Sequence, residues 1–151
     1  MRKREVSIII AGFLLIMPVF VSAQTAAELE TVLGTKNLTC AQAAGFVLAA
    51  TEDTPAKNTS KTAFEQAMTR GWFPQGTAPE ENITLGRLSF IIMKAFNIKG
   101  GIMYTLFPGP RYAFRTMVSR SYIQGAADPA MKVNGERFLH ILGKVLSATG
   151  G

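Results

Sequence analysis

The chain has 151 residues, of which 48% are hydrophobic, and a formal net charge of +6. Its charges are scattered rather than gathered in runs, which argues against a nucleic-acid-binding arm. A single cysteine excludes an internal disulfide, and the lone His140 lacks the neighbouring histidines or cysteines that a metal site needs. The sequence contains no phosphate loop, nucleophile motif or dinucleotide fingerprint. We therefore expect no catalytic residue, metal or cofactor.

The N-terminus has the pattern of a secretory signal peptide. Three basic residues, 2–4, precede an apolar run over 6–21 that closes in a small-x-small pattern at Ala23, which predicts a signal peptide over 1–23. The alternative is a membrane anchor, because the run approaches the roughly 20 apolar residues that span a bilayer. Pro18 favours cleavage. We expect an exported protein of the periplasm or cell envelope, whose remaining part keeps 13 basic and 9 acidic residues, a net charge of +4.

Helices in the first half of the mature chain are predicted from capping boxes, in which a threonine is followed three residues later by Glu or Gln. Three such boxes, which begin at Thr25, Thr39 and Thr62, predict helices over about 25–33, 39–50 and 63–70. The polar stretch 51–60 contains a proline and is predicted to be a linker.

Two further caps are predicted in the second half. Thr84 should begin a helix over 84–96 and Asn134 a helix over 134–147, and residues 111–120 form the helix between them. No segment alternates over a convincing length for a strand. The sequence thus predicts an all-α fold.

A repeated segment organises the domain. Residues 63–97 align without a gap with 113–147, and a fainter third copy over 38–50 aligns with 83–95. The identical pairs of the two longer copies are Ala63/Ala113, Phe64/Phe114, Arg70/Arg120, Pro79/Pro129, Arg87/Arg137, Ile91/Ile141 and Lys94/Lys144. Repeats of this size imply stacked units that bury a shared core. We expect one domain over 24–151, with three helix–loop–helix units at about 25–50, 61–97 and 111–147.

Residues 98–110 form the least regular stretch. Glycines at 100–101 and a Pro-Gly-Pro sequence at 108–110 forbid a regular helix through its ends. The residues between them are largely apolar, and these are Ile102, Met103, Tyr104, Leu106 and Phe107. Either they pack under the helices as a small separate core, or they line a groove for a partner, as an exposed apolar patch does. In the second case Tyr104, Leu106 and Phe107 are the candidate partner-binding residues.

The repeats resemble those of S-layer homology domains. In that family a helix ending in Gly-Ile-Ile-x-Gly leads through a loop into a helix opened by Ile-Thr-Arg-Ala-Glu. The matching segments are 121–125 (SYIQG) with 128–129 (DP), more weakly 71–75 (GWFPQ), and the helix openings at 38–39, 83–84 and 133–134. Leu85, Gly135 and Cys40 stand where the family has its arginine. The resemblance covers about 38–147 and implies three helical units that bind a wall polysaccharide.

The candidate ligand-binding residues are Arg87, Arg137, Arg111, Trp72 and Tyr122. Arg87 and Arg137 lie in the first turn of their predicted helices, where a positive charge opposes the helix dipole at a cost of about 0.3–1 kcal/mol. Two alternatives explain why both copies tolerate it. The arginines either pair with a carboxylate of Glu80, Glu81, Asp128 or Glu136, or form an anion site with free helix N–H groups.

Cys40 lies near a predicted helix start, where a thiol pKa can fall. Because no second cysteine and no histidine is near it in the sequence, we expect a small, semi-buried side chain rather than a catalytic one.

Three functions follow from these patterns. The first is a non-catalytic envelope protein that binds an anionic wall polymer or scaffolds an envelope complex. The alternative is a protein-interaction module that acts through residues 100–110. A hydrolase would need a buried cluster of Glu, Asp and His140 in a cleft. We expect no nucleic acid, and contact with a membrane only through an uncleaved signal peptide.

Overall fold

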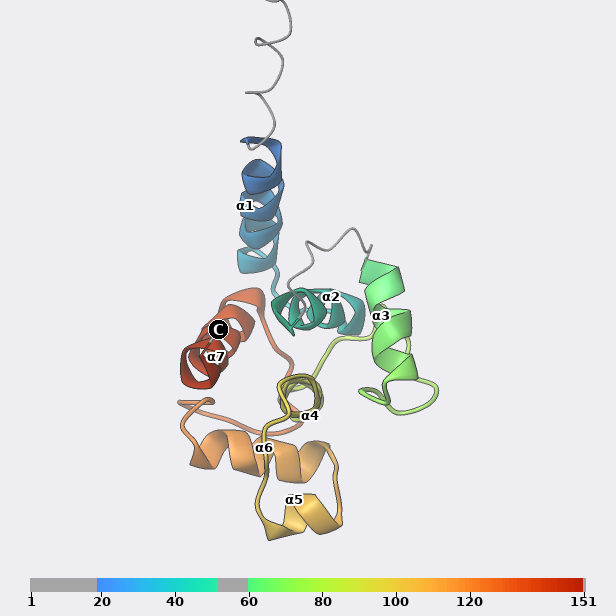
Figure 1. Cartoon of the computed structure of the whole chain (residues 1–151), viewed down its shortest axis with the longest axis vertical. Coiled ribbons are helices and arrows are strands. Elements are labelled where there is room, and N and C mark those ends of the chain that lie inside the picture. The colour runs from blue at the N-terminus through green and yellow to red at the C-terminus, as the bar shows by residue number, and fades with distance from the viewer. Residues whose placement is uncertain (1–18, 52–59, 151) are drawn as a thin grey trace, which may run out of the picture.

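In the computed structural model of the chain, the described residues are 19–51 and 60–150 (Figure 1). They form helices and no strand, which confirms the all-α fold class for this part of the chain. The helices are α1 (Val19–Leu33), α2 (Cys40–Thr51), α3 (Ser60–Thr69), α4 (Leu85–Ala95), α5 (Ile102–Leu106), α6 (Pro110–Ser119) and α7 (Gly135–Thr149). The predicted linker, apart from its end residues, and the predicted signal peptide up to residue 18 lie outside the described residues.

Side-chain caps begin α2, α4 and α7 as predicted. At α2 the box is reciprocal, since the Gln42 N–H donates to Thr39 Oγ1 at 3.2 Å and the Thr39 N–H donates to Gln42 Oε1 at 3.0 Å. Thr84 and Asn134 each accept the backbone N–H three residues further on, at 3.4 and 2.8 Å. Each cap satisfies an N–H group that the helix leaves without an internal partner.

The other two predicted caps are wrong. Thr25 lies inside α1, which begins at Val19, and Thr62 lies inside α3, which begins at Ser60. The working caps at 39, 84 and 134 each follow a residue held in the centre of the domain by hydrogen bonds from other segments. Within the described ranges no such residue precedes Thr25 or Thr62, and the helices extend upstream of them to Val19 and Ser60.

Three buried residues at the centre of the domain form a closed ring of backbone hydrogen bonds. The Leu38 N–H donates to the Val133 carbonyl at 2.8 Å, the Val133 N–H to the Ile83 carbonyl at 3.2 Å, and the Ile83 N–H to the Leu38 carbonyl at 2.9 Å. All three side chains are 0% exposed. These are the residues that the repeat alignment places in register, so each copy contributes one donor and one acceptor to the ring.

The helix starts next to the ring are bonded to neighbouring loops. The first N–H groups of α2 and α4 donate to loop carbonyls at 2.8–3.0 Å, in the pairs Cys40 to Glu81, Ala41 to Pro79, Leu85 to Met131 and Gly86 to Pro129. The bonds at α2 and α4 are equivalent in the repeat. The donors Cys40 and Ala41 align with Leu85 and Gly86, and the acceptors Glu81 and Pro79 align with Met131 and Pro129. The identical pair Pro79/Pro129 therefore has a structural role, because each proline carbonyl receives an N–H from the preceding copy. At α7 the Gly135 N–H donates instead to the Thr35 carbonyl at 2.9 Å.

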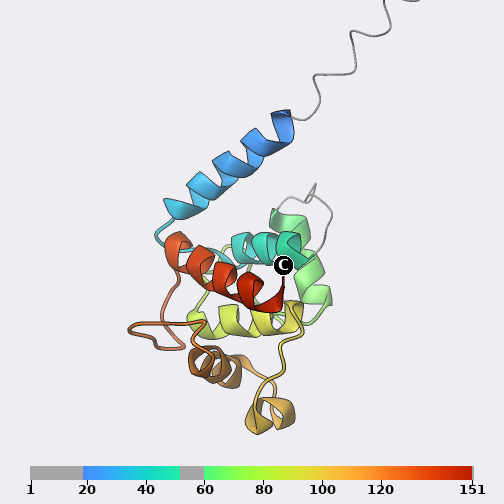
Figure 2. The same ribbon diagram turned by 60° about the vertical axis from the view of Figure 1, so that its left-hand side comes forward.

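Helix α4 lies in the middle of the domain and packs against α2 and α6, while α2 packs against α3 (Figures 1 and 2). At the other side α7 contacts α1. The helix boundaries of the two longer copies correspond in part, since α3 and α6 begin and end 50 residues apart and α4 and α7 begin 50 apart. The ends of α4 and α7 differ, because α4 ends at Ala95 whereas α7 continues to Thr149. Ile91 and Ile141 are both buried, at 0% and 1% exposure.

Candidate functional site

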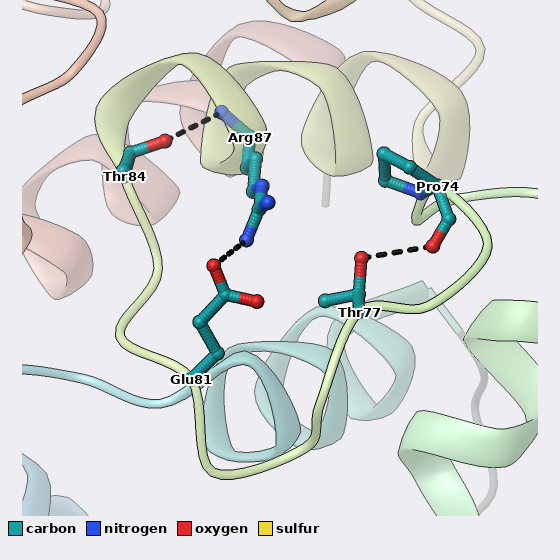
Figure 3. Close-up of polar contacts among 5 residues, drawn as sticks. All are labelled: Pro74, Thr77, Glu81, Thr84 and Arg87. Atoms are coloured by element: carbon teal, nitrogen blue, oxygen red, sulfur yellow. Dashed lines mark hydrogen bonds and ion pairs between the residues drawn. The ribbon is translucent and has the colours of Figure 1, made fainter.

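Arg87 is tied to the loop that precedes its own helix (Figure 3). Its Nη1 lies 2.6 Å from Glu81 Oε1, in an ion pair whose side chains are 27% and 45% exposed. This Nη1 atom is itself buried, and the Arg87 guanidinium also lies beside the Cys40 thiol. Of the two sequence-based alternatives for Arg87, the geometry therefore corresponds to carboxylate pairing.

Arg137 occupies the equivalent place in the next copy but finds different partners. Its Nη2 donates to the Ala126 and Gln124 carbonyls at 2.8 and 3.3 Å, and its Nη1 donates to Met131 Sδ at 3.0 Å. Met131 aligns with Glu81 in the repeat. Where the carboxylate is missing, the guanidinium binds backbone carbonyls of the loop instead.

Both arginines thus brace a loop of their own copy. The anion-site alternative also required free N–H groups at the helix start. At α4 the first three are engaged, because Leu85 and Gly86 donate to loop carbonyls and Arg87 donates to Thr84 Oγ1.

Arg137→Ala is expected to lower the free energy of unfolding by roughly 1–2 kcal/mol, because two carbonyls of the loop lose a charged donor. Arg111→Ala is the matched control. Arg111 is exposed and makes no hydrogen bond or ion pair among the described residues, so its loss should change the free energy by no more than about 0.5 kcal/mol. Urea unfolding followed by circular dichroism measures both. Equal effects would contradict the bracing role.

The two aromatic candidates differ in exposure. Trp72 is 5% exposed and belongs to the core, with the Arg70 guanidinium 5.5 Å from the centre of its ring. Tyr122 is half-buried. Within the described part of the chain, no hydrogen bond, ion pair or ring contact joins Arg111, Trp72 and Tyr122. The structure therefore does not bring the five predicted ligand-binding residues into one site.

Cys40 is more deeply buried than predicted, at 0% exposure, as the first residue of α2. Burial raises the pKa of its thiol above the ordinary value, and the neighbouring Arg87 guanidinium opposes that shift only in part. The thiol is therefore neutral near pH 7 and behaves as an apolar core side chain.

His140 is exposed on α7. The surface depression beside it is lined by residues of that one helix, including Leu139, Gly143 and Lys144, and so is not a cleft between elements. Among residues 19–51 and 60–150, no three or more His, Cys, Asp or Glu side chains are grouped so that they could hold a metal ion.

The apolar stretch between α4 and α6 forms the short helix α5, and of the two alternatives for this stretch the separate small core is wrong. Ile102, Leu106 and Phe107 are 79%, 63% and 61% exposed, and Met103 is 46% exposed. Only Tyr104 turns inward, with its ring centre 6.4 Å from that of Phe90. A five-residue helix between glycines and prolines can direct only one side towards the body, so the other side faces water.

We call Ile102, Met103, Leu106 and Phe107 the α5 tip.

Comparisons of the chain with protein-family models, with curated proteins and with solved structures found no match. None of the helices in the described ranges is long and apolar enough to cross a bilayer. A functional proposal therefore rests on the chain's own residues, and the α5 tip is the surface whose exposure needs an explanation.

Proposed function

We propose that the chain is an exported, non-catalytic binding module of the cell envelope. In this proposal three helix–loop–helix units, similar to those of S-layer homology domains, form a rigid scaffold that presents the α5 tip to another envelope component. The signal-peptide pattern supports export. The ring of Leu38, Ile83 and Val133 supports the three-unit arrangement, because equivalent residues of the three copies are bonded to one another in a cycle.

The exposure of the α5 tip carries the proposal. Four large apolar side chains stand on one short helix and its C-cap residue, and each is at least 46% exposed. Isolated apolar residues on a surface need no explanation, but a contiguous group marks a place where another apolar surface is bound. The tip is also distant from the part of the domain where the copies meet, since α5 lies at the end of the molecule opposite α1 (Figures 1 and 2).

A wall polymer is the second candidate partner, and the charge distribution favours it. Between Glu81 and Asp128 the sequence contains no acidic residue and six basic ones, which are Arg87, Lys94, Lys99, Arg111, Arg115 and Arg120. Such a stretch suits an anionic polymer. Retention of the protein by purified wall sacculi at low salt tests this candidate, and the absence of retention would remove it.

The α5 proposal predicts that Leu106→Ser reduces binding to isolated envelope fragments by about tenfold. The substitution removes a leucine side chain that is exposed in the free protein and becomes buried on binding. The test is co-sedimentation of the exported protein with the fragments, after its N-terminus has been established by intact mass. Leu33→Ser is the matched control. Leu33 is likewise a half-exposed leucine, at 54%, and lies on α1 at the opposite end of the molecule.

The wild type and Leu33→Ser should sediment alike, with Leu106→Ser left in the supernatant. Circular dichroism should be unchanged in both variants, because neither side chain is part of the core. Tyr104→Ser is less suitable, since Tyr104 is half-buried against Phe90 and its loss would loosen α5. Equal binding by Leu106→Ser and the wild type would overturn the α5 proposal.

A further inference from the structure

The α5 tip is convex. Residues 102 and 106 are four apart in the sequence and so share a side of the helix, and Phe107 follows directly as the C-cap, while Tyr104 turns to Phe90. Both views place α5 at the outer limit of the domain, beyond α6 (Figures 1 and 2). The tip is therefore a projection of the domain rather than a groove.

Some polar groups of the tip segment are bonded within the segment itself. The backbone N–H groups of Thr105 and Phe107 donate to the Gly101 and Met103 carbonyls at 3.0 and 2.9 Å. The Thr105 hydroxyl also donates to the Gly101 carbonyl, at 3.2 Å. The prolines at 108 and 110 have no N–H to satisfy. An unsatisfied backbone group is costly in hydrocarbon, and these bonds remove part of that cost.

Basic side chains surround the tip in the sequence. Lys99 precedes it, Arg111 and Arg115 follow it on α6, and all three are exposed. Arg120 is exposed as well, and its Nη2 donates to the Lys99 carbonyl at 2.6 Å, so the end of α6 lies next to the beginning of the α5 segment. The nearest acidic residues in the sequence are Glu81 and Asp128. An apolar projection with basic neighbours matches the acyl and headgroup layers of an anionic bilayer surface.

From these three observations we infer that the α5 tip binds an anionic phospholipid surface by inserting Ile102, Met103, Leu106 and Phe107 among the acyl chains. Lys99, Arg111 and Arg115 then lie at the headgroups. The inference rests on the proposed function and names the partner of the same surface. The sequence predicts contact with a membrane only through an uncleaved signal peptide. The inference adds a second membrane contact, at the α5 tip.

Vesicles provide the test. The exported protein should sediment with vesicles of phosphatidylglycerol and phosphatidylcholine and much less with phosphatidylcholine alone. Leu106→Ser should lower the partition coefficient about tenfold, and Leu33→Ser should leave it unchanged. Arg111→Gln should lower it about fivefold at low salt, and this difference should shrink as salt screens the charges. The Leu106→Ser effect should persist at high salt, because it is apolar.

Insertion itself has a direct signal. Phe107→Trp places an indole in the tip, and its fluorescence should shift to shorter wavelength on addition of the anionic vesicles. Trp72 is buried in the core and supplies a constant background, which the wild type measures. Vesicle binding without this shift would overturn insertion.

The outcomes separate the two proposals. If the wild type does not bind anionic vesicles but binds envelope fragments through Leu106, the lipid inference is wrong and a protein is the partner of the tip. If Leu106→Ser binds both vesicles and fragments as the wild type does, the proposed function is wrong as well.

Discussion

Ile91→Ala and Ile141→Ala are each expected to lower the free energy of unfolding by about 2–5 kcal/mol, the usual cost of removing a buried aliphatic side chain. The two residues are an identical pair of the repeat and are 0% and 1% exposed. They lie on α4 and α7, which begin at equivalent positions. Because both face the shared core, the two substitutions should have similar effects. Urea unfolding followed by circular dichroism measures the midpoint and the slope for each variant.

Ile102→Ala is the matched control for this pair. It removes the same atoms from a side chain that is 79% exposed, so the free energy of unfolding should change by no more than about 0.5 kcal/mol. If Ile141→Ala resembled the control while Ile91→Ala cost several times more, α7 would not be packed into the same core as α4, and the equivalence of the two copies would be wrong.

The sequence predicted the helices best where two independent signals agreed. At Thr39, Thr84 and Asn134 a capping residue coincided with a position of the repeat, and helices begin directly after them. At Thr25 and Thr62 the capping pattern stood alone, and the helix starts lie upstream. A threonine in the interior of a helix gives the same local pattern, so the pattern alone does not identify the start.

The ring of Leu38, Ile83 and Val133 was beyond local prediction. Alignment of the copies showed that the three residues are equivalent and apolar, but which N–H meets which carbonyl depends on how the copies close on one another. The partners of the arginines depended on the same closure. Glu81 was among the carboxylates expected to pair with Arg87. Arg137 instead binds backbone carbonyls, and because every residue has a backbone carbonyl, the sequence does not indicate which ones.

The α5 tip shows a different limit. Apolar composition indicated that residues 102–107 avoid water, and it could not distinguish burial within the domain from burial against a partner. Chain geometry decides between the two. The flanking glycines and prolines confine the helix to five residues, and only Tyr104 reaches the body.

Gly135→Ala is expected to displace α1 and to lower the free energy of unfolding by roughly 1–3 kcal/mol, the cost of overpacking a close contact. Gly135 is the first residue of α7, and a methyl group on it would overlap the carbonyl of Val32. Val32 is 2% exposed near the end of α1, and the Gly135 N–H donates to the Thr35 carbonyl at 2.9 Å. The backbone of α1 therefore occupies the space that a side chain at 135 needs.

Gly143→Ala, on the same helix, isolates this steric effect. Apart from the nearby backbone of α7 itself, no atom of the described residues lies within 4 Å of a methyl group at 143. The substitution should therefore stabilise the protein by about 0.5–1 kcal/mol, because alanine loses less backbone entropy on folding than glycine. The two glycine variants should thus differ in sign in urea unfolding. Limited proteolysis should cut near residues 33–36 faster in Gly135→Ala than in the wild type, because an undocked α1 exposes that connection. In the other copies the position equivalent to Gly135 is occupied by Leu85 and Cys40, whose side chains are both 0% exposed. A stable Gly135→Ala with unchanged proteolysis would mean that α1 does not pack against the start of α7.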